Sequence, residues 1–256
     1  MLIVGVDVET NGLDSAEHEV IEFGGVLFCT IAKRVLATFG KIYKVEKWCG
    51  EAEKCHRITR EMSDLMPTFQ DDGIIPSKAL SIHLAEFVVA HNAGHDHPFV
   101  TKLDPGFLKV PWICTQRDLK HEDKIDRVSS RRLAHLCVDY HLPMGSWHQA
   151  VADAEACARI AGEHDLKAAY KWKITPKFRL LAYGPYLAHV GKDAMNQCPS
   201  VLAGGQKYRW NTDEYPRAWM GQDLTEEFVA KDAKYIKEVT EGQWKFEAEP
   251  MLPKPY

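Results

Sequence analysis

The stretch LIVGVDVET, residues 2–10, is a β-branched run with alternating character, a pattern that predicts a β-strand. Side chains two positions apart in a strand point to the same face, so Asp7 and Glu9 project together while Val6 and Val8 face the other side. Two adjacent carboxylates repel and raise each other's pKa unless a cation lies between them. Taken alone, the pair also fits an edge strand with one solvated polar face.

Working outward, the next runs predict a layered α/β domain. EVIEFGGVLFCTI (19–31) and KRVLATFGKIYKV (33–45) predict two further strands, which would complete a three-stranded antiparallel meander. Beyond it we expect short strands at VVAHN (88–92) and VPWICT (110–115). The predicted helices cover 74–87, 95–103, 129–141 and 149–170, the last being the longest. This order predicts a mixed sheet flanked by helices, in a domain spanning residues 1–170.

Composition is that of an ordinary soluble protein, with 45% hydrophobic and 27% charged residues among 256. The seven cysteines are scattered and odd in number, which favours reduced thiols in a cytosolic compartment. The closest cluster, Cys49, Cys55 and His56, lacks the second pair of a structural zinc site. We expect no membrane segment, because no apolar run approaches the roughly 18–20 residues that a span needs.

A second acidic position follows the predicted strand at 88–92. The strand ends at His91-Asn92, and Asp96 comes four residues after Asn92, at the start of a predicted helix. An acid at that position is also a common partner of the helix dipole, so Asp96 alone indicates no particular chemistry.

A third pair, His148 and Asp153, lies five residues apart. On a regular helix this spacing is about 500° of rotation, so the two side chains would not share a face. They converge only if His148 lies in the loop before the helix and Asp153 lies one turn inside it. The Gly145-Ser146 pair permits such a loop, and histidine is the side chain most easily poised as a base near neutral pH.

In this order and at these separations, the three motifs resemble the DEDD exonuclease superfamily, in particular its histidine-bearing branch. The matches are D-x-E-T at Asp7, Glu9 and Thr10, H-N-x-x-x-D at His91, Asn92 and Asp96, and H-x-x-x-x-D at His148 and Asp153. The segment 56–59, HRIT, is similar to the family's H-G-I-T before a helix. The resemblance covers about residues 1–168 and implies a ribonuclease H-like fold.

The resemblance also implies a role for each matched side chain. Asp7 would bridge two divalent metal ions, Mg²⁺ or Mn²⁺, and Glu9 and Asp153 would complete the first metal site. Asp96 would act through water at the second, and His148 would take a proton from the attacking water. One departure from the family is that the residue before Asp96, usually aromatic, is histidine here.

Four residues are candidates for binding substrate: Thr10, Leu13, Asn92 and Trp147. Thr10 would contact the terminal nucleotide through its backbone, although closing the end of the strand is an equally good role. Leu13 and Trp147 would wedge terminal bases apart, whereas an isolated tryptophan is more often a core residue.

Residues 175–256 lie outside the resemblance and predict a small α+β module. KYRWNTDEYPRAWMGQDL (207–224) predicts a hairpin, DLTEEFVAKDAKYIKEVT (223–240) a helix with Thr225 in a capping box, and MLPKPY (251–256) a frayed tail. Lys207, Arg209 and Arg217 interleave with aromatics, as in surfaces that stack bases and hold phosphates. A small aromatic core that packs on the first domain explains the same pattern.

The function these features favour is a 3′–5′ exonuclease acting on single-stranded or frayed DNA ends. An RNA-directed exonuclease stays open, since discrimination depends on contacts at the 2′-hydroxyl. A catalytically idle nucleic-acid-binding subunit is disfavoured because all five catalytic positions are present. A replication or repair partner is compatible with this sequence, which leaves the oligomeric state open.

Overall fold

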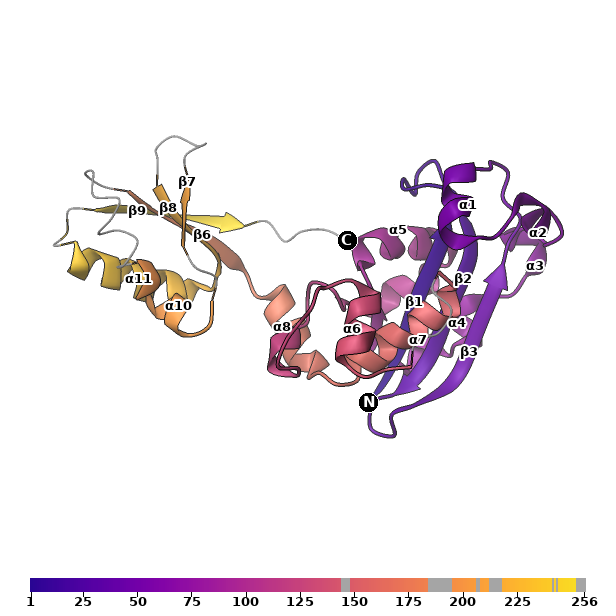
Figure 1. Ribbon diagram of the computed structural model, residues 1–256, viewed down its shortest axis with the longest axis horizontal. Helices are drawn as coiled ribbons and strands as arrows, with labels where there is room; N and C mark the ends of the chain where they lie inside the picture. The colour runs from indigo at the N-terminus through magenta and orange to yellow at the C-terminus, as the bar shows by residue number, and fades with distance from the viewer. Residues whose placement is uncertain are drawn as a thin grey trace. The chain divides into compact units, whose positions relative to one another are not determined.

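The first three strands of the computed structural model are those that the alternating runs predict. β1 (Leu2–Thr10), β2 (Val20–Cys29) and β3 (Arg34–Ile42) form an antiparallel meander. Two short buried strands, β4 (Phe87–Ala90) and β5 (Trp112–Cys114), extend the sheet in parallel beyond β1. The order β3-β2-β1-β4-β5 gives a mixed five-stranded sheet, which is the ribonuclease H-like arrangement (Figure 1).

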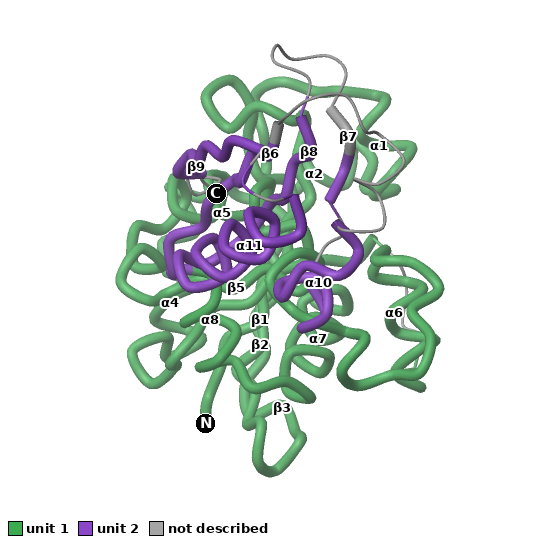
Figure 2. The backbone as a smooth tube through the Cα atoms, turned by 90° about the vertical axis from the view of Figure 1, so that its left-hand side faces the viewer, with its two compact units in different colours: residues 1–173, 256 green, residues 174–255 purple. Residues whose placement is uncertain are grey.

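The chain divides into two compact units, residues 1–173 and residues 174–255 (Figure 2). The residues that the structure describes are 1–143, 148–183, 195–205, 208–211, 218–240, 242 and 244–251. Among them, none of the helices combines the length and the apolar character needed to cross a bilayer.

Helices cover both faces of the first unit's sheet. The α-helices are α1 (Gly50–His56), α2 (Arg60–Asp64), α3 (Phe69–Asp72), α4 (Pro76–Ala79), α5 (Ala93–Leu103), α6 (Leu133–Asp139), α7 (Ala150–Ala161) and α8 (Leu166–Ile174). Three 3₁₀ turns are η1 (Ile82–Leu84), η2 (Pro105–Lys109) and η3 (His121–Asp123).

Two hydrophobic clusters separate these faces. On one, Val6 and Phe23 pack with Phe99 of α5; on the other, Val26 packs with Ala158 of α7. Figure 1 shows α7 lying across β1 and β2. Residues of β1 therefore point alternately toward α5 and toward α7, as the strand's period of two requires.

Three predicted helices were wrong in extent. Residues 74–87 form only the four-residue α4 and the turn η1, because Ser81 between them adopts a left-handed φ of 49°. The long helix predicted over 149–170 ends at Ala161 and a separate helix starts at Leu166. The helix at 129–141 begins only at Leu133, because the Ser130 hydroxyl accepts the Arg132 N–H and holds a turn instead of capping.

The second unit is a four-stranded antiparallel sheet. Its strands are β6 (Lys177–Tyr183), β7 (Arg209–Asn211), β8 (Ala218–Leu224) and β9 (Lys245–Met251), in the order β7-β8-β6-β9. β7 and β8 pair as the predicted hairpin, and the helices are α10 (Pro199–Leu202) and α11 (Glu226–Val239). Thr225 precedes α11 as expected, but its side chain makes no capping hydrogen bond, so the predicted capping box was wrong.

Two of the aromatics predicted for nucleic-acid contact are core residues of this unit. Tyr208 and Trp219 are buried among Leu180 and Ile236. The Tyr208 hydroxyl donates to the fully buried Asp232 at 2.9 Å, and the Ser200 amide donates to the same carboxylate at 2.9 Å. These contacts place both aromatics in a core of the second unit itself. Lys207, residues 212–217 and the tail 252–256 lie outside the described residues.

Candidate active site

Small residues let α7 approach the sheet closely enough to bring Asp153 to β1. A Cβ at Gly24 would lie 2.1 Å from the Ala150 carbonyl carbon, and one at Gly5 would lie 2.3 Å from the Ala154 carbonyl oxygen. Side chains at these two positions would hold the helix away from the strands. Because α7 touches β1 and β2 along its backbone, the Asp153 carboxylate in its first turn reaches the face that carries Asp7.

Four carboxylates from three elements gather on this face. Asp7 and Glu9 come from β1, and Asp153 comes from α7. The register of β1 and β2 places Gly24 opposite Asp7 and Glu22 opposite Glu9, so Glu22 adds a fourth acid. A Glu22 oxygen accepts the Ala150 N–H at 3.2 Å, which ties β2 to the start of α7.

Asp96 joins the cluster from the other side of the sheet. It is 3% exposed in the first turn of α5, and its Oδ1 accepts the Val8 N–H at 3.3 Å. Asn92, just before α5, takes a left-handed φ of 59° that turns the chain from β4 into the helix. His95 packs its ring on Phe99 at a centroid distance of 5.0 Å, which is the kind of packing that an aromatic residue would supply.

Burial raises the pKa of every acid in the cluster, and repulsion by neighbouring acids adds to it for Asp7, Glu9, Glu22 and Asp96. For Asp7 burial is the largest cause, followed by the charges of Asp96, Asp153 and Glu9. Burial and then Glu22 raise the pKa of Glu9 to about 7. Burial raises the pKa of Asp96 to about 8, against the lowering effect of the Val8 N–H. Burial likewise raises the pKa of Asp153, partly offset by the His148 N–H.

Such a group of acids is costly without positive charge among them, and cations relieve the repulsion. The donor set is one of oxygens, as hard divalent cations prefer. The cluster's chemistry therefore fits a divalent metal.

His148 lies in the loop before α7, as its five-residue spacing from Asp153 predicts. It is exposed, with a left-handed φ of 59°, and its N–H donates to Asp153 Oδ2 at 3.3 Å. One ligand atom each of Glu9, His148 and Asp153 lie within 4.8 Å of one another, close enough to hold one metal ion together. On the other side, His148 Nδ1 lies 3.8 Å from the Sγ atom of Cys55, in α1.

The candidate substrate residues fall into different environments. Thr10 is buried and its hydroxyl donates to the Gly12 carbonyl at 2.7 Å, so its side chain closes the strand end. Leu13 is 87% exposed in the loop that follows β1, and Asn92 is exposed as well. Trp147 lies outside the described residues.

Sequence reasoning missed Glu22 and Cys55 at this site. Glu22 stands inside an apolar run, VIEFGG, and a lone acid in a buried strand could have drawn attention to it. Cys55 had no such signal, because only the docking of α1 brings its thiol to His148.

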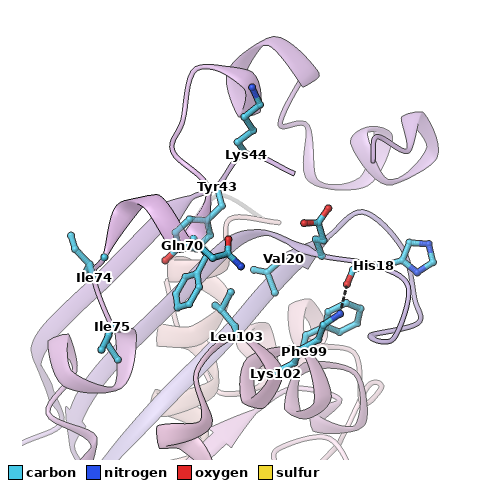
Figure 3. Close-up of a pocket in the computed structure, with 13 residues that line it drawn as sticks. His18, Val20, Tyr43, Lys44, Gln70, Ile74, Ile75, Phe99, Lys102 and Leu103 are labelled. Carbon is cyan, nitrogen blue, oxygen red and sulfur yellow. Dashed lines mark hydrogen bonds between the residues drawn. The ribbon is translucent and has the colours of Figure 1, made fainter. Parts of the chain in front are cut away.

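A separate cavity of about 480 Å³ lies on the α5 face of the sheet, away from the α7 face that carries Asp7 and Glu9 (Figure 3). Its apolar wall includes Val20, Tyr43 and Phe99, and the Lys102 ammonium at its rim donates to the His18 carbonyl. Neither the four motif acids nor His148 lines it, so it is separate from the candidate active site.

Comparison with solved structures supports the fold. Escherichia coli Exonuclease I in complex with a dT13 oligonucleotide is 14% identical, with a TM-score of 0.53, over 70% of this chain and 48% of that one. The nuclease domain of 3′hExo, a DEDDh family member bound to rAMP, is 18% identical, with a TM-score of 0.50, over 66% of this chain and 93% of that one. This chain thus spans about half the length of Exonuclease I. At these identities the likeness establishes the fold. A comparison with curated proteins gave no match.

Family membership rests on the sequence itself. The family model described as Exonuclease (RNase_T) matches residues 4–161, which include all three motifs. Those motifs supply the four acids and the histidine that the fold brings together around β1. The chain belongs to the exonuclease family.

Proposed function

We propose that this chain removes nucleotides from the 3′ end of single-stranded or frayed DNA by metal-dependent hydrolysis of the terminal phosphodiester. The observation that carries the proposal is the convergence of Asp7, Glu9, Asp96 and Asp153 with the exposed imidazole of His148. The acids raise one another's pKa, and a merely structural role would not require such repulsion.

Asp7, Glu9 and Asp153 would hold one divalent ion, and Asp7 with Asp96 would hold a second. When bound, two such ions activate water and stabilise the leaving oxygen of an in-line displacement. Mg²⁺ and Mn²⁺ match the oxygen donors present.

The chain's own residues supply the proton transfer. His148 is exposed, so its ring is accessible to water and to the scissile phosphate. Its backbone N–H on Asp153 fixes the loop against α7, which keeps the imidazole next to the acids. A neutral imidazole in this place accepts the proton of the attacking water. The N–H of Ala150 on Glu22 holds the same end of α7 to the sheet.

DNA is the substrate that we favour, in line with the dT13 oligonucleotide in Exonuclease I, the fold neighbour with the higher TM-score of the two. The rAMP in 3′hExo makes RNA the alternative. A catalytically idle binding subunit is disfavoured, because all five motif side chains are present and assembled.

The test is hydrolysis of 5′-labelled single-stranded DNA, blunt duplex DNA and single-stranded RNA of one sequence, with Mg²⁺, Mn²⁺ or EDTA. We expect a ladder that shortens from the 3′ end of single-stranded DNA, loss of cleavage in EDTA, and loss of cleavage in Asp7→Asn. Retention of more than a few percent of turnover by Asp7→Asn would remove that residue's metal role. Faster hydrolysis of RNA would replace DNA by the alternative, and no cleavage of any substrate would overturn the proposal.

A further inference from the structure

A thiol stands beside the histidine of the acidic cluster. Cys55 is exposed near the C-terminal end of α1, and its Sγ lies 3.8 Å from Nδ1 of His148. Burial of the thiol, and next the charge of Glu9, raise the pKa of Cys55. Hydrolysis as described above makes no use of this sulfur.

With Cys55 the cluster offers a mixed set of ligand atoms. Ligand atoms of Glu9, His148 and Asp153 lie within 4.8 Å of one another, and the Cys55 sulfur lies outside that group but 3.8 Å from Nδ1 of His148. Mg²⁺ takes oxygen ligands and gains little from sulfur, whereas Zn²⁺ favours thiolate and imidazole together.

The separation between the sulfur and the imidazole nitrogen suits zinc. Zn–S bonds of about 2.3 Å and Zn–N bonds of about 2.0–2.1 Å, at a tetrahedral angle, separate sulfur from nitrogen by about 3.6 Å. The separation of Cys55 Sγ from His148 Nδ1 is 3.8 Å, so these two ligands need almost no rearrangement. The carboxylates would have to close from within 4.8 Å to about 3.4 Å of the imidazole nitrogen, and the Cys55 sulfur, which lies outside their group, would have to approach them to about 3.6 Å.

We infer that Cys55, His148, Glu9 and Asp153 form a site for Zn²⁺ that switches the nuclease off. The switching rests on the proposed function: coordination occupies the imidazole nitrogen that would accept a proton, and it draws Glu9 and Asp153 away from Mg²⁺. The binding site itself does not depend on nuclease activity.

The experiment compares the full-length wild-type chain with Cys55→Ser, using Cys49→Ser as the matched control. Cys49 precedes the same helix and is partly exposed, but its sulfur has no described contact with His148. Binding is measured without Mg²⁺ by Zn²⁺ titration calorimetry and by the thiolate-to-metal charge-transfer absorption of the Co²⁺ complex. Inhibition by Zn²⁺ is then measured for Mg²⁺-supported hydrolysis of single-stranded DNA.

We expect the charge-transfer absorption in wild type and Cys49→Ser and its absence in Cys55→Ser. Loss of a supporting group outside the ligand set already costs about 10–100-fold in metal affinity, so loss of the sulfur should weaken Zn²⁺ binding at least about tenfold. Measured relative to its own rate in Mg²⁺ alone, Cys55→Ser should need correspondingly more Zn²⁺ for inhibition.

Equal Zn²⁺ affinity in wild type and Cys55→Ser, or an absorption that disappears in Cys49→Ser, overturns the site. Zn²⁺ that binds through Cys55 but leaves hydrolysis unchanged overturns the switch. A wild-type chain that binds Co²⁺ through Cys55 and hydrolyses nothing would leave the site standing and defeat the proposed function.

Discussion

Gly24 is the position where adding a single carbon atom should damage the active site most directly. A Cβ there would lie 2.1 Å from the Ala150 carbonyl carbon and 2.2 Å from the Val151 nitrogen. Ordinary van der Waals contact begins at 3.4 Å, so in Gly24→Ala the start of α7 must move by about 1.3 Å. Both clashing atoms are backbone, so no side-chain rotation relieves the contact.

This displacement would move Asp153, which is the fourth residue of α7. A misplacement of about 1 Å at a catalytic group can cost about 100-fold in rate. We therefore expect kcat on single-stranded DNA to fall about 100-fold in Gly24→Ala. Overpacking of this kind should also lower the free energy of unfolding by about 1–3 kcal/mol.

Steady-state kinetics and urea unfolding measure the two effects. Gly50→Ala is the control, because its Cβ meets nothing within 4 Å. Gly40→Ala should have an intermediate effect, since its Cβ meets only a methyl group of Val151, at 2.4 Å. A Gly24→Ala chain that folds and retains the wild-type kcat would refute the idea that contact between α7 and the sheet positions Asp153.

The site supports three further predictions. His148→Ala should lower kcat by about 10²–10⁴-fold with no change in Tm, because the side chain is exposed; an unchanged kcat would exclude it as the proton acceptor. In EDTA, folded Glu9 and Asp96 keep protons up to a pH of about 7 and about 8, because their pKa values are raised; the unfolded chain releases these protons near the ordinary pKa values of 4.5 and 3.8. Stability without metal should therefore fall as pH rises from about 4 to 8, with Mg²⁺ restoring Tm most at the upper end; a flat Tm profile in EDTA would contradict this. Glu22→Gln should keep an acceptor for the Ala150 N–H, whereas Glu22→Ala should lose about 0.5–1.5 kcal/mol in urea unfolding; equal stabilities would show that this hydrogen bond does not hold α7.

Local geometry made much of the site predictable from the sequence. The alternation of residues 2–10 determines that Asp7 and Glu9 share a face, because a strand's side chains alternate whatever surrounds it. The spacing of His148 and Asp153 excludes a common helix face, and the structure has the loop-then-helix arrangement that this requires.

Helix boundaries were less predictable, because competing local conformations decided them. Apolar spacing over 74–87 suited a helix, but the left-handed Ser81 divides the segment into two short pieces. Of the apolar positions at helical spacing, Leu80 and Phe87 are buried but Leu84 is 52% exposed, so the pattern identified only part of the core and mistook the form of the backbone.

The sequence by itself determined the five motif residues, the meander that begins with LIVGVDVET and the family. Each of these depends on neighbours in the chain or on a motif within one element. Only the tertiary structure decided that Glu22 faces Glu9 and that Cys55 lies beside His148. The first depends on the register between two strands, and the second on the docking of α1 against the loop before α7. Both join side chains far apart in the chain, and no local pattern specifies their distance.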